Sequence, residues 1–238
     1  MATETTPVLI LCGGRGTRLQ NQRETIPKAL VEVGGKPIVW HIIHCYVAAG
    51  FREIVLLTGY LAEQIEAFVS GSDWPEGVSV SCLQTGLDTP TGGRVAAAAD
   101  LLGDRTFCLT YGDGLSDVDL RTLLAEHEQS GAAVSLTAVQ PELPFGILEL
   151  DGDSVAGFEE KPRATEWING GFMCAGPELL QELDGDSVLE RNPLQTLAAA
   201  GKLRAHRHHG FWACMDTYKE TLMLNDLYDS GSAPWRCW

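Results

Sequence analysis

A short apolar run followed at once by a glycine-rich turn constrains the fold of this chain more than any other feature. Residues 8–12 read Val-Leu-Ile-Leu-Cys, which predicts a buried strand. The turn after this strand contains three glycines, a hydroxyl and an arginine, at Gly13, Gly14, Gly16, Thr17 and Arg18. Glycines leave the backbone N–H groups of such a turn open, so it can hold phosphate groups. Lys28 adds a second positive charge where an anionic ligand would lie.

Two other phosphate-binding loops do not fit the turn. The dinucleotide pattern G-x-G-x-x-G needs a glycine where Leu19 stands. A P-loop needs Ser or Thr after its Gly-Lys pair, but Pro37 follows Lys36. A glycine turn without any ligand is the simpler alternative. The Gly-Thr-Arg sequence and the later Lys28 favour an anion site over that alternative.

Length and composition limit the class of protein. The chain has 238 residues and 45% hydrophobic content, enough for one α/β domain with a large core. No apolar run approaches the roughly 18 residues that span a bilayer, and the first residues lack the features of a signal peptide. The seven cysteines form no C-x-x-C pair, which favours buried free thiols. We therefore expect a cytoplasmic protein.

The net charge of −15 argues against nucleic acid or an anionic membrane as a partner. An acidic protein that binds phosphates must gather its few cations locally. Five cations do lie within a short stretch around the glycine turn, at Arg15, Arg18, Arg23, Lys28 and Lys36.

Strands and helices alternate in the first half of the chain. Strands are expected at 8–12, 53–57, 78–83 and 106–111, and helices at 37–50, 62–69 and 95–102. This order predicts an α/β fold with a mainly parallel sheet and helices on both faces. The second half is richer in strands, at 134–139, 147–150, 155–159 and from 167, with helices at 177–183, 193–200 and 218–228.

Polar groups stand at the ends of several of these elements. Thr91-Gly-Gly-Arg94 makes a second glycine turn before a helix, and Thr89 precedes it. Asp113 stands between two glycines at the end of a buried strand, where open α/β sheets place ligand-binding groups. Asp216 follows another apolar stretch, and two such carboxylates could hold one Mg²⁺. Such a set of phosphate-binding loops, cations and carboxylates is typical of phosphoryl or nucleotidyl transfer. It does not distinguish kinases, phosphatases and nucleotidyltransferases from one another.

Motifs along the whole chain match the pattern of one known family. They are Gly13-Gly-Arg-Gly-Thr-Arg18, Pro27-Lys28, Gly34-Gly-Lys-Pro37, Gly112-Asp113, Glu160-Lys-Pro162 and Asn169-Gly-Gly171. Together they resemble the signature of the sugar-1-phosphate nucleotidyltransferases. Further pieces are most similar to the glucose-1-phosphate cytidylyltransferases among them, namely Thr91-Gly-Gly-Arg94, Tyr111-Gly-Asp-Gly114, Phe211-Trp212, Met215-Asp-Thr217 and Ala233-Pro-Trp235.

The resemblance implies a single-domain, Rossmann-like fold with a mixed, mostly parallel sheet flanked by helices and a β-rich sugar-binding section. Residues 1–133 would form the nucleotide-binding part, and 134–238 the sugar-phosphate-binding part with a C-terminal helix. The implied reaction joins an NTP, CTP being favoured, to a hexose 1-phosphate, glucose 1-phosphate being favoured, and releases pyrophosphate. Mg²⁺ is the implied cofactor, and a homo-oligomer is the implied assembly.

The resemblance also assigns roles to residues. The catalytic residues would be Arg18, which contacts the triphosphate, and Lys28, which neutralises the α-phosphate. Asp113 and Asp216 would bind Mg²⁺. The nucleotide would be bound by Leu11, Gly13, Gly14, Gly16, Thr17, Thr89, Gly93, Arg94 and Gly112. The sugar phosphate would be bound by Gly146, Glu160, Lys161, Asn169, Gly170 and Glu190. No general base is needed, because the attacking phosphate is already ionised near neutral pH.

Three alternatives stay open. The same chemistry could use another NTP, or a modified sugar, heptose or cyclitol phosphate; Pro90 stands where the resemblance leads us to expect a methionine. A non-catalytic regulator that binds nucleotide sugars is a second alternative, although such a protein has no need of both Asp113 and Asp216. An NAD-dependent oxidoreductase is the third, and the incomplete dinucleotide pattern argues against it.

Overall fold

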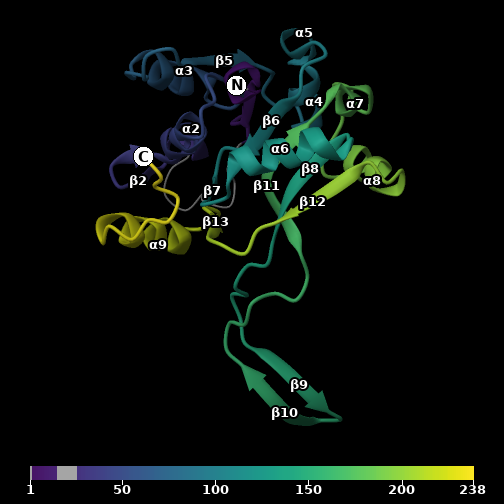
Figure 1. Cartoon of the computed structure of the whole chain (residues 1–238). Coiled ribbons are helices and arrows are strands. Elements are labelled where there is room, and N and C mark those ends of the chain that lie inside the picture. The colour runs from purple at the N-terminus through teal and green to yellow at the C-terminus, as the bar shows by residue number, and fades with distance from the viewer. Residues whose placement is uncertain (1, 15–25) are drawn as a thin grey trace.

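The computed structural model describes residues 2–14 and 26–238, and a seven-stranded sheet forms its centre (Figure 1). In spatial order the strands are β12 (Leu203–Arg207), β8 (Val134–Val139), β11 (Ile168–Ala175), β6 (Phe107–Tyr111), β1 (Val8–Leu11), β4 (Glu53–Thr58) and β5 (Ser79–Gln84). Strand β11 is antiparallel to both of its neighbours, and the other neighbouring pairs are parallel. The predicted mixed, mostly parallel sheet is confirmed.

The two faces of the sheet carry two separate cores, because successive side chains of a strand point to opposite faces. Val8 and Ile10 of β1 belong to one core, and Leu9 belongs to the other. The first core is completed by α2 (Ile38–Ala48), α3 (Ala62–Ser70), α6 (Leu120–Ser130) and α9 (Tyr218–Asp229). The second is completed by α4 (Thr91–Ala96), α5 (Ala99–Leu102), α7 (Pro177–Gln181) and α8 (Asn192–Ala199). Helices on both faces were predicted, and this is confirmed.

The predicted limits of the helix at 95–102 are wrong. Two short helices, α4 and α5, replace it, and α4 begins at Thr91, so the second glycine turn is itself helical. Glycine at position 93 allows α4 to pack closely against the loop that contains Gly185, because a Cβ at Gly93 would overlap the carbonyl group of Gly185. Proximity to that loop, which comes from far along the chain, could not be inferred from local sequence.

Several short elements and one full helix escaped the sequence prediction. Helix α6 is largely polar, yet its ends carry ordinary signals: Asp119 caps the N-terminus by accepting hydrogen bonds from two backbone N–H groups, and Gly131 ends it with a φ of 65°. The shorter elements are α1 (Ala2–Thr5), η2 (Lys28–Leu30), β2 (Glu32–Val33), β3 (Lys36–Pro37), β7 (Gly114–Ser116) and β13 (Trp212–Cys214). Across the described residues, the model contains no helix with the length and apolar character needed to cross a membrane.

The strands β9 (Ile147–Asp151) and β10 (Ser154–Glu159) form an antiparallel hairpin at the end of a long extension of the chain. We call residues 141–166 the arm; it projects away from the body of the protein (Figure 1). The hairpin with its turn at 151–153 is confirmed. Its apolar side chains are exposed, including Leu150 at 63% and Phe158 at 65%. The arm therefore carries an apolar surface that the body of the chain does not cover.

Helix α9 links two segments that are far apart in sequence. Its residue Asn225 accepts a hydrogen bond from the backbone N–H of Gly34, at 2.9 Å, in the β2–β3 hairpin. That hairpin begins four residues after Lys28, and α9 begins two residues after Asp216. Helix α9 therefore fixes the segment carrying Lys28 relative to Asp216.

Candidate active site

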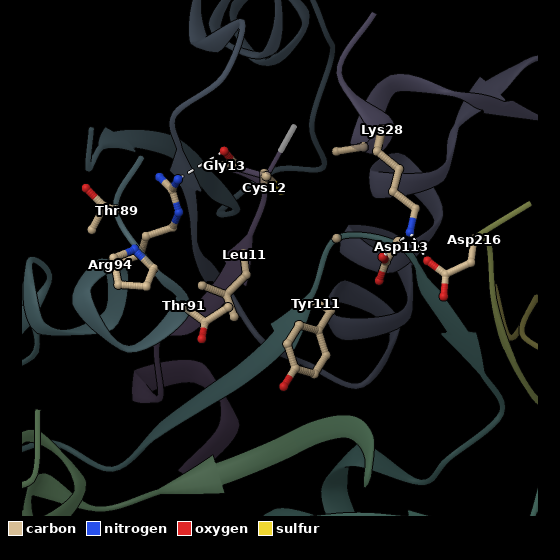
Figure 2. Close-up of a pocket in the computed structure, with 14 residues that line it drawn as sticks. Leu11, Cys12, Gly13, Lys28, Thr89, Thr91, Arg94, Tyr111, Asp113 and Asp216 are labelled. Atoms are coloured by element: carbon tan, nitrogen blue, oxygen red, sulfur yellow. Dashed lines mark hydrogen bonds and ion pairs between the residues drawn. The ribbon is translucent and has the colours of Figure 1, made fainter. Parts of the chain in front are cut away.

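A cavity of about 420 Å³ lies where β1 and β6 end, at the carboxyl edge of the parallel strands (Figure 2). Nine of the residues predicted from the sequence line it, namely Leu11, Gly13, Gly14, Lys28, Thr89, Arg94, Gly112, Asp113 and Asp216. The cavity has two ends, with Lys28 and the two aspartates at one and Arg94 with Thr89 at the other (Figure 2). This position is where open α/β sheets bind ligands.

The first end is built around a lysine held between two carboxylates. The Nζ of Lys28 lies 2.5 Å from Oδ2 of Asp113 and 2.5 Å from Oδ1 of Asp216. Burial acts to lower the pKa of Lys28, but the charge of Asp113 and hydrogen bonds to both carboxylates outweigh burial and raise that pKa above its usual value. Lys28 is therefore an ammonium group at neutral pH. We call these three residues the lysine–carboxylate cluster.

The donors of this cluster fit a hard divalent cation. Ligand atoms of Asp113, Asp216 and Cys214 all lie within 4.8 Å of one another. Carboxylate oxygens are the ligands that Mg²⁺ prefers, and a thiol is not. Burial and the neighbouring Asp113 raise the pKa of Cys214 well above its usual value, so this group stays a neutral thiol. The two carboxylates are therefore the candidate ligands for Mg²⁺.

The other end is organised by a buried arginine. Arg94 is only 4% exposed and lines the cavity, but its guanidinium donates hydrogen bonds mainly to backbone carbonyl groups. The acceptors are Thr58 O at 2.9 Å, Gly86 O at 2.8 Å, Thr85 Oγ1 at 2.6 Å, Gly13 O at 3.0 Å and Leu87 O at 3.3 Å. These groups belong to the ends of β1, β4 and β5. Arg94 thus ties the first glycine turn to two neighbouring strands.

The two remaining nucleotide-side predictions near Arg94 are placed differently. Thr89 lines the cavity, and its hydroxyl donates to the carbonyl of Thr85 at 2.5 Å. Gly93 does not line the cavity. Its backbone N–H donates a hydrogen bond to the carbonyl of Ser187 at 3.0 Å, so this part of α4 packs against the segment that contains Ser187. Gly16, Thr17 and Arg18 lie outside the described residues, so the structure does not test their predicted contacts.

A tyrosine connects the cavity to part of the predicted sugar side. Tyr111 lines the cavity and donates a hydrogen bond to Oε1 of Glu190 at 2.6 Å. The other oxygen of Glu190 accepts from Thr91 Oγ1 at 2.7 Å, and Asn169 Nδ2 lies 3.4 Å from the Tyr111 hydroxyl. Burial and the charge of Glu190 raise the pKa of Tyr111, so it remains a hydrogen-bond donor. Glu190 and Asn169 therefore contact side chains of the cavity wall, without being part of that wall themselves.

The structure separates the other predicted sugar-side residues from this wall. Gly146 comes just before β9, and Glu160 and Lys161 just after β10, so all three belong to the arm (Figure 1). The carbonyl of Gly170 accepts a hydrogen bond from Trp212 Nε1 at 2.7 Å, which fixes β11 to the segment before Asp216. The sequence analysis did not place Tyr111 or Thr91 among the site residues, although each is the first residue of a motif that it did recognise.

The N-terminus of α9 holds Asp216 in place through a capping box. One carboxylate oxygen of Glu220 accepts from the backbone N–H groups of Asp216 and Thr217, each at 2.7 Å, and Thr217 Oγ1 accepts from the N–H of Glu220. Replacing an N-cap threonine by alanine removes one of these bonds and typically costs about 1 kcal/mol.

We therefore expect Thr217→Ala to lower the free energy of unfolding by about 1 kcal/mol in urea titrations. Thr217→Ser keeps the hydroxyl oxygen and is expected to behave as the wild type. Equal stability of the alanine variant and the wild type would show that the cap contributes nothing.

Comparison with known proteins agrees with the geometry. A family model described as nucleotidyl transferase matches residues 7–202. The "Probable glucose-1-phosphate cytidylyltransferase" of Bacillus subtilis is 38% identical over 251 residues, covering 97% of this chain and 99% of the relative. The glucose-1-phosphate cytidylyltransferase of Salmonella typhi is 36% identical, covering 97% of this chain and 98% of the relative.

More distant matches include a relative named for another nucleotide and a solved structure with the same fold. The mannose-1-phosphate guanylyltransferase catalytic subunit beta of Danio rerio is 30% identical, covering 92% of this chain and 64% of that protein. The crystal structure of HddC from Yersinia pseudotuberculosis has the same fold, with a TM-score of 0.75 at 21% identity, covering 94% of this chain and 99% of that one. Because the family model spans most of the chain and relatives above 30% identity match it over nearly its full length, the chain belongs to the nucleotidyl transferase family.

Proposed function

We propose that this protein transfers a nucleotidyl group from an NTP, CTP being preferred, to a hexose 1-phosphate, glucose 1-phosphate being preferred. The products are an NDP-sugar and pyrophosphate. The lysine–carboxylate cluster carries this proposal, because it places one cation and two metal-type carboxylates beside the glycine turn at one end of the cavity. The names of the relatives at 38% and 36% identity favour CTP and glucose 1-phosphate.

The chemistry follows from charge. An ionised oxygen of the sugar phosphate attacks the α-phosphorus of the NTP in line with the bond to the β-phosphate oxygen. The new P–O bond forms as that bond breaks, and pyrophosphate leaves with the electron pair. Lys28, whose ammonium lies in the lysine–carboxylate cluster, is the residue proposed to neutralise the α-phosphate oxygens, and charge of this kind is a large source of rate. The residues need to supply position and charge, and no proton has to be removed from the attacking group.

Asp113 and Asp216 are the residues proposed to hold Mg²⁺. When bound, this ion neutralises triphosphate charge and orients the phosphates. The far end of the cavity, beside Thr89 and Thr91, is proposed for the nucleoside, and Glu190 with Asn169 for hydroxyl groups of the sugar. Arg94 keeps the shape of the nucleoside end through its bonds to the glycine turn.

The test is pyrophosphate release with Mg²⁺, crossing five NTPs (CTP, UTP, GTP, ATP and dTTP) with a panel of sugar 1-phosphates. We expect release with CTP and glucose 1-phosphate. Release only with another pair would keep the mechanism and reassign the substrates. The guanylyltransferase relative makes GTP with mannose 1-phosphate the first such pair to test. Nucleotide binding without release from any pair would favour a non-catalytic regulator.

We further propose that the chain forms a homo-oligomer through the arm. Exposed apolar clusters of this kind mark interaction surfaces, and an isolated two-stranded hairpin is marginally stable in water. Leu150 and Phe158 supply much of that surface. Burying each such side chain is worth about 1.5–3 kcal/mol, so removing both weakens the assembly strongly.

The double variant Leu150→Ser with Phe158→Ser is expected to elute as a monomer in size-exclusion chromatography with light scattering, while the wild type elutes as an oligomer. Leu222→Ser removes an apolar side chain of α9 that is 46% exposed and serves as the matched control. A wild-type oligomer that the control breaks and the arm variant leaves intact would move the interface to α9.

A further inference from the structure

Lys28 occupies the place between the two carboxylates that we assign to the metal. Its Nζ contacts one oxygen of Asp113 and one oxygen of Asp216, both at 2.5 Å. The side chain is 16% exposed, and so it is held inside the site, away from bulk water. In the proposed reaction, however, Lys28 has to face the α-phosphate of the nucleotide. One residue therefore has two different positions to fill.

The charges explain the first position. Asp113 and Asp216 come from segments about a hundred residues apart and bring two negative charges within 4.8 Å of each other. Like charges at this separation repel, and the repulsion is strong where water is partly excluded. The Lys28 ammonium removes that repulsion. A divalent cation that binds both carboxylates needs the oxygens that Lys28 now contacts. The positive charge of Lys28 also repels that cation.

We infer that Lys28 is an internal placeholder that competes with the divalent cation for Asp113 and Asp216, and that nucleotide phosphates draw it away. This inference rests on the proposed function, since it takes the two carboxylates as the metal ligands. The triphosphate supplies new anionic partners for the ammonium, so Lys28 gives up the two carboxylate oxygens that the metal needs. Metal and nucleotide then favour each other's binding, and such coupling is reciprocal. The site stays neutralised before its substrates arrive.

Lys28→Met removes the competing cation, so the variant is expected to bind metal more tightly than the wild type in the absence of nucleotide, although it loses turnover. Mn²⁺ is the probe, because electron paramagnetic resonance measures its free concentration directly. We expect the dissociation constant for Mn²⁺ to fall about tenfold or more, within the usual range of coupling between two sites.

Lys36→Met is the matched control. It removes the same charge from the same chain, but Lys36 lies on β3 with its Nζ 5.7 Å from the centroid of the Trp40 ring. This variant is expected to bind Mn²⁺ as the wild type does. An equal gain in affinity for both lysine variants would reduce the effect to overall charge and would overturn the inference, as would unchanged or weaker Mn²⁺ binding by Lys28→Met.

Folding is checked in the same samples by circular dichroism. Lys28→Gln, which keeps a polar side chain, is a second variant in case Lys28→Met folds poorly. Because Mn²⁺ replaces the missing positive charge, we expect it to raise the Tm of both Lys28 variants more than that of the wild type. Equal shifts in all three proteins would contradict the competition.

Asp113→Asn separates this inference from the proposed function. If Asp113→Asn abolishes Mn²⁺ binding while Lys28→Met binds as the wild type does, the carboxylates are metal ligands and only the competition is wrong. If Mn²⁺ affinity is the same in all variants, including Asp113→Asn, the metal role of the carboxylates is wrong as well. If Lys28→Met gains affinity and Asp113→Asn loses it, both stand.

Discussion

Asp113→Asn is expected to lower turnover by about 10³-fold, the loss typical of removing one preorganised charge from an active site. Asp113 is the carboxylate at the end of β6, and it contacts Lys28 and stands beside Asp216. An amide has nearly the same shape but no negative charge, so it binds a divalent cation poorly and no longer balances Lys28. The measurement is kcat for pyrophosphate release with saturating substrates.

Asp104→Asn is the matched control for this experiment. Asp104 is exposed in the turn before β6 and lies outside the cavity lining. Its variant is expected to turn over at the wild-type rate. A folded Asp113→Asn protein with wild-type kcat would remove Asp113 from the catalytic machinery.

Gly13→Ala is expected to destabilise the protein by about 2 kcal/mol, as overpacking of a fixed site typically does. A Cβ at Gly13 would overlap the guanidinium of Arg94. Arg94 cannot move aside without breaking its hydrogen bonds to the ends of β1, β4 and β5, which leaves buried carbonyl groups unpaired. Since this change distorts the glycine turn, nucleotide affinity is expected to fall as well.

The neighbouring glycine supplies the control. Among the described residues, no heavy atom would lie within 4 Å of a Cβ at Gly14. Gly14→Ala is therefore expected to change the free energy of unfolding by no more than about 0.5 kcal/mol. Urea titration of both variants measures the difference. Equal stability of Gly13→Ala and Gly14→Ala would mean that Arg94 does not hold the turn as the structure indicates.

The parallel sheet could be predicted because its central strands are short apolar runs between turn signals, such as 8–12 and 106–111. Helix α6 was missed because its residues are mostly polar, although Asp119 and Gly131 mark its two ends. The arm shows a different limit. The alternation at 147–150 and 155–159 predicted two strands and their turn, but alternation does not say which sheet a strand joins.

Within the site, the sequence predicted which residues gather and not how they bond. Asp113 and Asp216 were expected to act together, and the structure brings them together. The bridge made by Lys28 was not expected, because the sequence suggested only a positive charge facing phosphate. Arg94 was expected to contact the nucleotide, whereas its donors mainly bind carbonyl groups from three strand ends. Such partners depend on tertiary contacts between distant segments, which local motifs do not encode.

The most direct test of the central claim is the identity of the products. ³¹P NMR of the purified protein with Mg²⁺, CTP and glucose 1-phosphate would follow both phosphorus-containing products in one sample. The proposed reaction predicts pyrophosphate and a diphosphate-linked nucleotide sugar appearing in equal amounts as CTP is consumed. Formation of CDP with a sugar bisphosphate would instead mean transfer of the γ-phosphoryl group to glucose 1-phosphate, and would contradict attack on the α-phosphate.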